Sequence, residues 1–461
     1  MESFEYAGQW WIPGFENEKV SGLVRFKPNE GSELELTGSL VGAEEGQNPK
    51  IINGYANGKA LTLYSCFCKN KSSHRSIDLP DMSYERYSVQ VVFIGHCFSA
   101  EDDIKFDELC VGFHNLENWT GITGIKFDMC PDKEDPKLFC SAKYIIPDEI
   151  EIKLNDFNMS LRHSFKNGGD EIRNLSIEQS SYFRVATSQP KHFNEYIENI
   201  VFHLQNYLSF GLNSPTYPRE VVGFNNAIKE SGREFAKNID IYYGSTGHVD
   251  SEKRIYWTDM LFSYRTASDM FIQSVMNWFE KKDILKPVYD LYFASVYNSR
   301  VYLDYQFLTY IQALESFHRR MFDGDYIEDE QYKKVFEDLI KHIPEKLSRS
   351  HRDSLKSRIK YGNEFSLRKR LDELFKKHSR LKFLILRDSS KFINKVIDTR
   401  NYLTHYTEEL ELKASYGEDL YYLVITLKFI VQFCILISMG FSEEKAIKIV
   451  QENREFRHSR F

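Results

Sequence analysis

Arg400, Asn401 and His405 are residue types that suit chemistry on a phosphodiester. An arginine guanidinium binds a phosphate and stabilises the charge that develops on it in the transition state. A histidine can take the proton of a ribose 2′-hydroxyl or give one to the leaving oxygen. An asparagine can hold either neighbour in orientation. No cluster of carboxylates accompanies the three residues, so a two-metal mechanism is not indicated and no metal or cofactor is expected.

The spacing of these residues places them on one side of a helix predicted over 390–406. At 100° per residue, with Ile393 at 0°, Arg400 falls at about 340°, Asn401 at about 80° and His405 at about 120°. Arg400 thus continues the apolar stripe that Ile393 and Val396 begin. A guanidinium on a buried stripe is costly unless it has an anionic partner.

A second interpretation of the same spacing is structural. Arg400 could form an ion pair with Asp398 or Glu315, and His405 could be uninvolved in any chemistry. The pattern Arg-x-x-x-x-His occurs once in the chain, but the pattern alone does not decide between the two interpretations.

The first part of the chain has the period of β-strands and the last part that of helices. Short alternating segments and the Asn-Gly pairs at 53, 57 and 167 predict strands joined by tight hairpins. They indicate an antiparallel sandwich or barrel, with one helix near 191–209. The fold class is therefore α+β, with a β-rich domain at 1–280 and an all-α helical bundle at 281–461. Residues 220–275 give no clear pattern, and the later helices are expected at 302–322, 329–342, 345–361, 366–378, 390–406, 417–439 and 443–456.

Composition excludes several classes of protein. The chain has 461 residues, of which 42% are hydrophobic and 28% charged, and this excludes a largely disordered chain and a polytopic membrane protein. The net charge of −7 argues against a nucleic-acid partner, but residues 1–150 hold 24 acidic and 14 basic side chains. Residues 341–382 hold 14 basic and 5 acidic ones. This basic segment is either a solvated helical face or a footprint for RNA phosphates.

Two further patterns have simple interpretations. Residues 420–439 are apolar enough for a membrane span, but Lys428 and Gln432 share one face, so we expect a buried core helix and no membrane association. The N-terminus does not read as a signal peptide, so a cytoplasmic protein is expected. The seven cysteines then read as reduced thiols, because the spacing of His96, Cys97, Cys110 and His114 fits none of the usual zinc patterns.

Several segments carry a resemblance to a known family. Residues 398–406 resemble the signature of the HEPN superfamily: an arginine, a polar residue, three variable residues and a histidine, late in a helical bundle. Residues 307–319 resemble the early helix of ApeA-like HEPN domains. Residues 8–14, 22–26 and 115–119 resemble the β-rich ApeA N-terminal domain. Residues 324–380 depart from a minimal HEPN bundle as an insertion rich in Lys and Arg.

The resemblance implies a bacterial anti-phage abortive-infection protein with a metal-independent RNA endonuclease domain, for which tRNA is a candidate substrate. Two chains would pair as a homodimer or a higher homo-oligomer, so that their motifs face one cleft. Arg400 would bind the phosphate, His405 would be the general acid or base, and Asn401 would support them. The expected products carry a cyclic phosphate and a 5′-hydroxyl. The β-rich domain would sense or regulate, with a phage-encoded protein as the trigger.

Three residues are weaker candidates for substrate binding. Glu315 follows Leu314 on a helix that could face the motif, but it could equally pair with Arg400. Tyr402 and Tyr406 could stack on RNA bases or simply pack. Two alternatives to a nuclease also stay open: a non-catalytic HEPN-like module that binds RNA or protein, and a ligand-binding β-domain with a helical oligomerisation partner.

Overall fold

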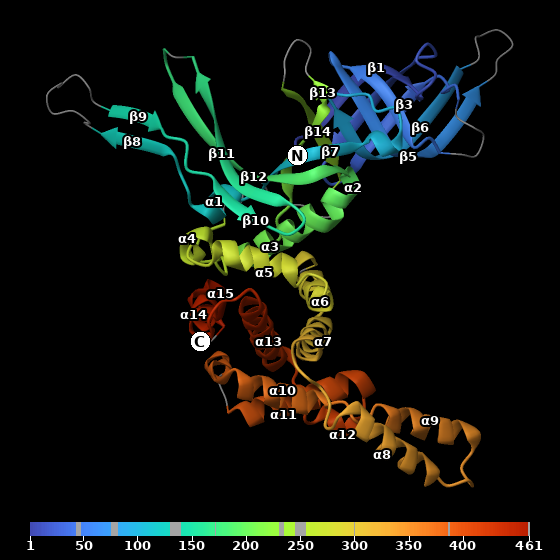
Figure 1. The fold of residues 1–461 in the computed structure, drawn as a ribbon, viewed down its shortest axis with the longest axis vertical. Helices are drawn as coiled ribbons and strands as arrows, with labels where there is room; N and C mark the ends of the chain where they lie inside the picture. Colours follow the sequence, from blue (N-terminus) through green and yellow to red (C-terminus); the bar gives the residue numbers. More distant parts are fainter. Residues whose placement is uncertain are drawn as a thin grey trace. The chain divides into compact units, whose positions relative to one another are not determined.

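The computed structural model describes residues 1–42, 48–74, 82–129, 140–170, 172–229, 235–244, 255–298, 300–385 and 388–459 (Figure 1). The chain folds into two compact units, Met1–Ile272 and Gln273–Phe461. The first unit is rich in strands and the second is helical, which confirms the predicted fold class.

The first strands of unit 1 close into an antiparallel barrel. In the order β6-β3-β2-β1-β4-β5, each strand pairs with the next, and β5 pairs back with β6. The strands are β1 (Phe4–Trp11), β2 (Val20–Lys27), β3 (Gly31–Thr37), β4 (Ile51–Ala56), β5 (Lys59–His74) and β6 (Met82–Ile94). Their alternate residues fill the interior with a core that includes Trp10, Val24, Leu34, Leu63 and Val92.

The Asn-Gly pairs behave differently from one another. Asn57-Gly58 forms the predicted hairpin turn between β4 and β5, with both residues at positive φ. The prediction is wrong for Asn53-Gly54, which lies inside β4, and for Asn167-Gly168, which lies inside β11 (Asn158–Gly169). Gly54 is needed there for packing, because a Cβ at this position would lie 2.2 Å from Cε3 of Trp10.

The sheet continues past the barrel through a second set of antiparallel strands. From β6 outward the order is β14-β13-β7-β12-β11-β10. The added strands are β7 (Lys105–Phe113), β10 (Ile150–Lys153), β11, β12 (Leu175–His192), β13 (Pro218–Lys229) and β14 (Ala236–Tyr243), and β8 (Ile125–Met129) pairs separately with β9 (Cys140–Tyr144). The unassigned region 220–275 therefore holds most of β13, β14 and the short helix α4 (Tyr264–Ala267).

Helices of unit 1 lie at the end of these added strands. The predicted helix near 191–209 is present as α2 (Phe193–Tyr196), a π-helical turn (Ile197–Val201) and α3 (Phe202–Leu212). It begins after His192 because β12 extends that far. The other short elements are η1 (Glu101–Asp103) and α1 (Leu116–Thr120). Trp119 of α1 is buried, and its indole N–H donates a 2.9 Å hydrogen bond to the Phe262 carbonyl.

Unit 2 contains every helix that the sequence predicts after residue 300. Its elements are α5 (Phe271–Glu280), which begins in unit 1, α6 (Lys286–Tyr297), α7 (Leu303–Met321), α8 (Asp329–Lys341), α9 (Arg349–Lys360), α10 (Leu367–Lys377), η3 (Ser379–Leu384), α11 (Ser389–His405), α12 (Glu408–Glu411), α13 (Gly417–Ser438), α14 (Glu443–Glu452) and α15 (Arg454–His458). The last predicted helix is divided at Asn453, whose side chain caps α15 by accepting from the Glu455 N–H.

Helix α13 forms the core of unit 2 and packs against α7 and α14. It is the one helix in the described part of the chain that is long and apolar enough to cross a membrane, but 72% of its most apolar window is buried. The two polar side chains that the sequence singled out on this helix have partners. Lys428 Nζ lies 2.6 Å from Glu455 Oε2, and Gln432 Nε2 donates to the Tyr292 hydroxyl at 2.9 Å. Both partners are side chains of the same unit, as expected for a helix in the core of a protein.

Candidate functional site

Helix α11 carries the Arg-x-x-x-x-His motif and is held by its buried side. Asp388 caps its N-terminus, and the Asp388 side chain accepts from the Lys391 N–H at 3.3 Å. The buried residues of the helix are Phe392, Ile393, Val396, Thr399 and Leu403. On the projection with Ile393 at 0°, they lie between about 240° and 360°.

Arg400 lies at the edge of this buried arc and is half-buried. Its Nη1 donates to Asn401 Oδ1 at 3.3 Å, and its carbonyl accepts from the Thr404 hydroxyl at 2.7 Å. Among the described residues, no carboxylate lies within ion-pair distance of its guanidinium. The alternative interpretation, an ion pair of Arg400 with Asp398 or Glu315, is therefore not supported by the described residues. Arg400 is half-buried rather than buried because the core-facing arc is centred near 300°, on Val396 and Leu403, and Arg400 at about 340° lies close to its edge.

His405 is exposed and is the last residue of α11. The structure thus brings Arg400 and Asn401 into direct contact and leaves His405 at the end of the same helix. Within the described ranges, no hydrogen bond joins His405 to either residue. Its imidazole is open to solvent and to any molecule that approaches the C-terminal end of α11.

Glu315 is not part of this group. It lies on α7, and its Oε1 is 3.1 Å from Arg319 Nη2, one turn along the same helix. Arg319 also contacts Glu364 at 2.5 Å. The alternative in which Glu315 pairs with Arg400 is therefore not what the structure shows, since Arg319 is the cation that Glu315 contacts.

Three tyrosines form an aromatic cluster beside the motif. The Tyr402 ring lies 5.3 Å from that of Tyr406 and 5.4 Å from that of Tyr416, in edge-to-face geometry. Tyr406 and Tyr416 are 66% and 46% exposed, so their ring surfaces are accessible. Tyr406 is the C-cap residue of α11 and has a left-handed backbone conformation, with φ +52°. Its N–H donates to the Tyr402 carbonyl at 2.7 Å. Sequence reasoning missed Tyr416, which lies outside the motif helix.

A hydrogen bond from a backbone N–H to a side chain holds the segment that carries Tyr416. The Ser415 N–H donates to the hydroxyl of Thr399 at 3.0 Å, and both residues are buried. Behind this contact lies a cavity of about 160 Å³, lined by Lys391, Phe392, Lys395, Ser415, Asp419, Tyr422, Leu423 and Thr426. Lys395 Nζ closes one side by donating to the carbonyls of Lys413 and Ala414. In the sequence, this contact is signalled by a single feature, the polar Thr399 among the apolar core positions of α11.

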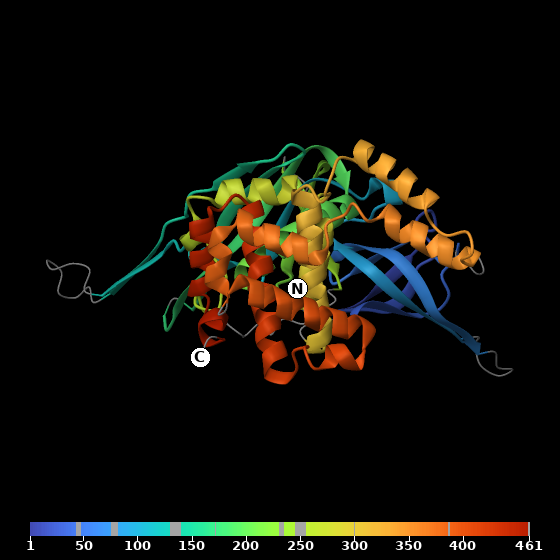
Figure 2. The ribbon, with the colours of Figure 1, turned by 90° about the horizontal axis from the view of Figure 1, so that it is seen from below.

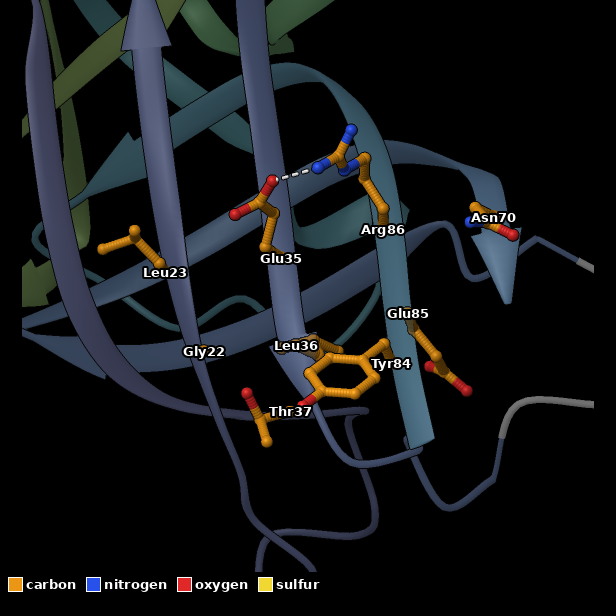
Figure 3. A pocket seen from close by; sticks show the side chains of 9 residues that line it. All are labelled: Gly22, Leu23, Glu35, Leu36, Thr37, Asn70, Tyr84, Glu85 and Arg86. Atoms are coloured by element: carbon orange, nitrogen blue, oxygen red, sulfur yellow. Dashed lines mark hydrogen bonds and ion pairs between the residues drawn. The ribbon is translucent and has the colours of Figure 1, made fainter. Parts of the chain in front are cut away.

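A larger pocket of about 680 Å³ lies on the barrel of unit 1 (Figure 3). Each of its charged side chains, Glu35, Glu85 and Arg86, forms an ion pair. Glu35 contacts Arg86 at 2.5 Å and Arg25 at 2.9 Å. The buried Glu85 accepts from the Tyr87 hydroxyl at 2.8 Å and lies 2.7 Å from Lys71 Nζ. The pocket has room for a small polar molecule, which would meet the Glu35, Glu85 and Arg86 side chains.

The residues considered for zinc do not form a metal site. In the described part of the chain, no three His, Cys, Asp or Glu side chains are placed to hold a metal ion. The Cys97 thiol donates to the Leu61 carbonyl at 3.6 Å. Burial, together with the nearby chain N-terminus and Arg219, lowers the pKa of His114 to about 4.

Family models match both units. The ApeA N-terminal domain 1 model matches residues 5–278, and the Apea-like HEPN model matches residues 308–445, which contain α11 and its motif. No curated protein and no solved structure matches the chain significantly. HEPN domains are generally ribonucleases, and this architecture occurs in anti-phage defence. Because the first model alone spans more than half of the sequence, the chain belongs to the ApeA-like family of HEPN anti-phage nucleases.

Proposed function

We propose that this protein is a metal-independent RNA endonuclease that acts through Arg400, Asn401 and His405 and protects bacteria from phage by abortive infection. The observation that supports this proposal most is the environment of the Arg400 guanidinium. The guanidinium is half-buried and touches the neutral Asn401, and no carboxylate among the described residues neutralises it. A cation in this state can accept a phosphate without first breaking an ion pair.

Each residue has a role that its position allows. Arg400 binds a non-bridging phosphate oxygen and stabilises the charge of the pentavalent transition state. Asn401 Oδ1 orients the guanidinium through its hydrogen bond. His405 takes the proton of the ribose 2′-hydroxyl, whose oxygen attacks phosphorus while the bond to the 5′-oxygen breaks. The 5′-oxygen gains a proton, so the products carry a 2′,3′-cyclic phosphate and a 5′-hydroxyl.

The reaction needs a base and an acid on opposite sides of one phosphorus atom. One copy of the motif supplies a single histidine, and that histidine cannot serve both roles in the same step. We therefore propose a homodimer in which the His405 side chains of two chains flank one phosphodiester. Tyr402, Tyr406 and Tyr416 would stack on neighbouring bases, to which exposed aromatic rings bind without sequence preference.

Unit 1 is proposed to control the nuclease in the cytoplasm. A phage-encoded protein would be the trigger, and tRNA would be among the RNAs cleaved. The barrel pocket favours a second possibility for this unit, the binding of a small polar ligand that regulates unit 2.

A second candidate function is a non-catalytic module that binds RNA. The absence of a hydrogen bond between His405 and Arg400 or Asn401 within the described part of the chain favours it. Such a module would bind RNA in a salt-dependent way and leave the RNA intact after long incubation.

The chemistry can be tested with an RNA whose cleavage site has been mapped, in excess EDTA. We expect cleavage of the all-ribose strand to fragments with a cyclic phosphate, and no cleavage when a 2′-O-methyl group blocks the attacking oxygen at that site. Cleavage of the blocked strand, or activity that EDTA abolishes, would contradict the proposed mechanism.

A further inference from the structure

Helices α8 and α9 form a hairpin arm between α7 and α10. They lie side by side and extend away from the other helices of unit 2 (Figures 1 and 2). Neither helix contains a fully buried residue. The arm therefore contributes little to the core of this unit, and its role should be found on its surface.

The two helices of the arm differ in charge. Helix α8 carries acidic and basic side chains in similar numbers, whereas all charged residues of α9 are basic except Asp353. Four of the α9 cations, Arg349, Arg352, Lys356 and Lys360, are spaced by three or four residues. At 100° and 1.5 Å per residue they fall within a sector of about 80° and extend over roughly 16 Å. We call these four residues the basic stripe.

The basic stripe is hardly neutralised. Arg349 lies 3.9 Å from Asp353, and in the described part of the chain the other three cations have no ion pair. Like charges one turn apart destabilise a helix, so such a row is unfavourable without an anionic partner. A merely solvated surface would more often carry mixed charges, as α8 does.

The two segments that connect the arm to the rest of unit 2 are hydrogen-bonded to each other. The Phe365 N–H donates to the Gly324 carbonyl at 2.6 Å, and the Tyr326 N–H donates to the Asn363 carbonyl at 2.9 Å. The buried Arg370 donates to the Phe365 carbonyl at 3.0 Å. Hydrogen bonds therefore tie the base of the arm to the segment after α7 and to α10.

The chemistry of this surface favours a polyanion over a protein. The large apolar side chains of α9, Leu355 and Ile359, are half-buried. The exposed apolar side chains of the arm include Val335 and Leu339 on α8 and Tyr361 after α9. The stripe itself therefore presents cations rather than the apolar anchors that protein interfaces need. Evenly spaced Arg and Lys side chains are the groups that bind nucleic-acid phosphates.

We propose that the basic stripe on α9 binds the phosphate backbone of the RNA substrate, at a place separate from the Arg400 motif. The proposal rests on the proposed function, since it assigns this arm the task of holding the RNA that α11 cleaves. The stripe would act without sequence preference, because phosphate contacts carry no base information.

The test replaces all four stripe residues by Gln (R349Q, R352Q, K356Q and K360Q) in the full-length His405→Ala protein, which should leave RNA intact. A matched control replaces four exposed cations elsewhere on the arm: K333Q, K334Q, K341Q and R358Q. Binding of a single-stranded RNA oligonucleotide is measured at several KCl concentrations. Thermal unfolding checks that both variants fold.

For the stripe variant we expect a Kd at least tenfold higher at low salt. The slope of log K against log salt should fall by about 2 to 3, from about 0.7 for each lost phosphate contact. The control should change Kd less than twofold. Equal slopes for the two variants would overturn the proposal. It would also be overturned if RNA binding were unchanged while the same four substitutions, made in the parent protein with His405 intact, abolished protection of cells, since that result would assign the stripe to a protein partner. Because binding is measured without cleavage, an inactive wild-type protein would refute the nuclease but not this assignment.

Discussion

The Ser415 N–H donates a 3.0 Å hydrogen bond to the buried hydroxyl of Thr399, the residue directly before Arg400. This bond joins the segment that follows the motif to the motif helix itself. It fixes Ser415 and, next to it, Tyr416, whose ring contacts Tyr402. The geometry of the aromatic cluster thus depends on a residue that has no chemical role of its own.

We expect Thr399→Val to lower the free energy of unfolding by about 1–3 kcal/mol, because a buried N–H loses its acceptor. Thr399→Ser keeps the hydroxyl and should cost less. Urea denaturation of the two variants measures the difference. If the valine variant were as stable as the serine variant, the hydrogen bond would not hold this segment.

Tyr406 combines an unfavourable backbone conformation with an accessible ring. A non-glycine residue in the left-handed region costs about 1 kcal/mol relative to glycine. Tyr406→Gly should therefore be at least as stable as the parent protein, while RNA affinity falls through the loss of a stacking surface worth about 1–3 kcal/mol per base. Calorimetric unfolding and RNA titration of the same samples separate the two effects. Unchanged RNA affinity would remove Tyr406 from the binding surface.

His318 links the stability of unit 2 to pH. It is 1% exposed, its Nδ1 lies 3.2 Å from Arg370 Nη1, and its Nε2 lies 3.2 Å from Glu373 Oε2. An arginine can only donate, so Nδ1 accepts and Nε2 carries the proton. Burial and the adjacent Arg370 lower the pKa of His318 below its ordinary value of 6.5, and the nearby Glu373 does not offset them.

The sign of the effect follows from proton binding. Between the lowered pKa and about 6.5 the unfolded chain binds a proton that folded His318 does not. Stability is therefore full above about 6.5 and falls as the pH drops below it. We expect the urea midpoint to decline from pH 7.5 to 5.5, and to decline less steeply in His318→Gln, which has a donor and an acceptor but does not titrate. Equal slopes for the two proteins would contradict this assignment.

The sequence predicted the elements well where local patterns determine them. Each later helix and its approximate limits followed from apolar periodicity, and the Lys428 and Gln432 positions distinguished a core helix from a membrane span. The motif was placed on the correct helix, although whether it is catalytic remains a prediction. Asn57-Gly58 was predicted correctly because a two-residue turn is a local feature.

Tertiary contacts could not be predicted in the same way. Gly54 is a packing residue under Trp10, and its Asn-Gly pair looks the same as a turn in sequence. Glu315 pairs with Arg319 one turn away rather than with Arg400 across the bundle, because the nearer cation needs no particular helix arrangement. The exposure of Arg400 depends on which part of α11 faces the core, and a shift of the buried arc by about 60° was enough to change it.

The most direct test of the nuclease is cleavage of tRNA and other RNA by the parent protein, Arg400→Ala and His405→Ala. Arg320→Ala and His342→Ala, which replace exposed residues elsewhere in unit 2, serve as matched controls. The proposed mechanism predicts that the parent protein and both controls cut RNA in EDTA, and that both motif variants lose cleavage by at least a hundredfold while remaining folded. If both motif variants cut RNA as well as the parent protein, Arg400 and His405 do not form the active site.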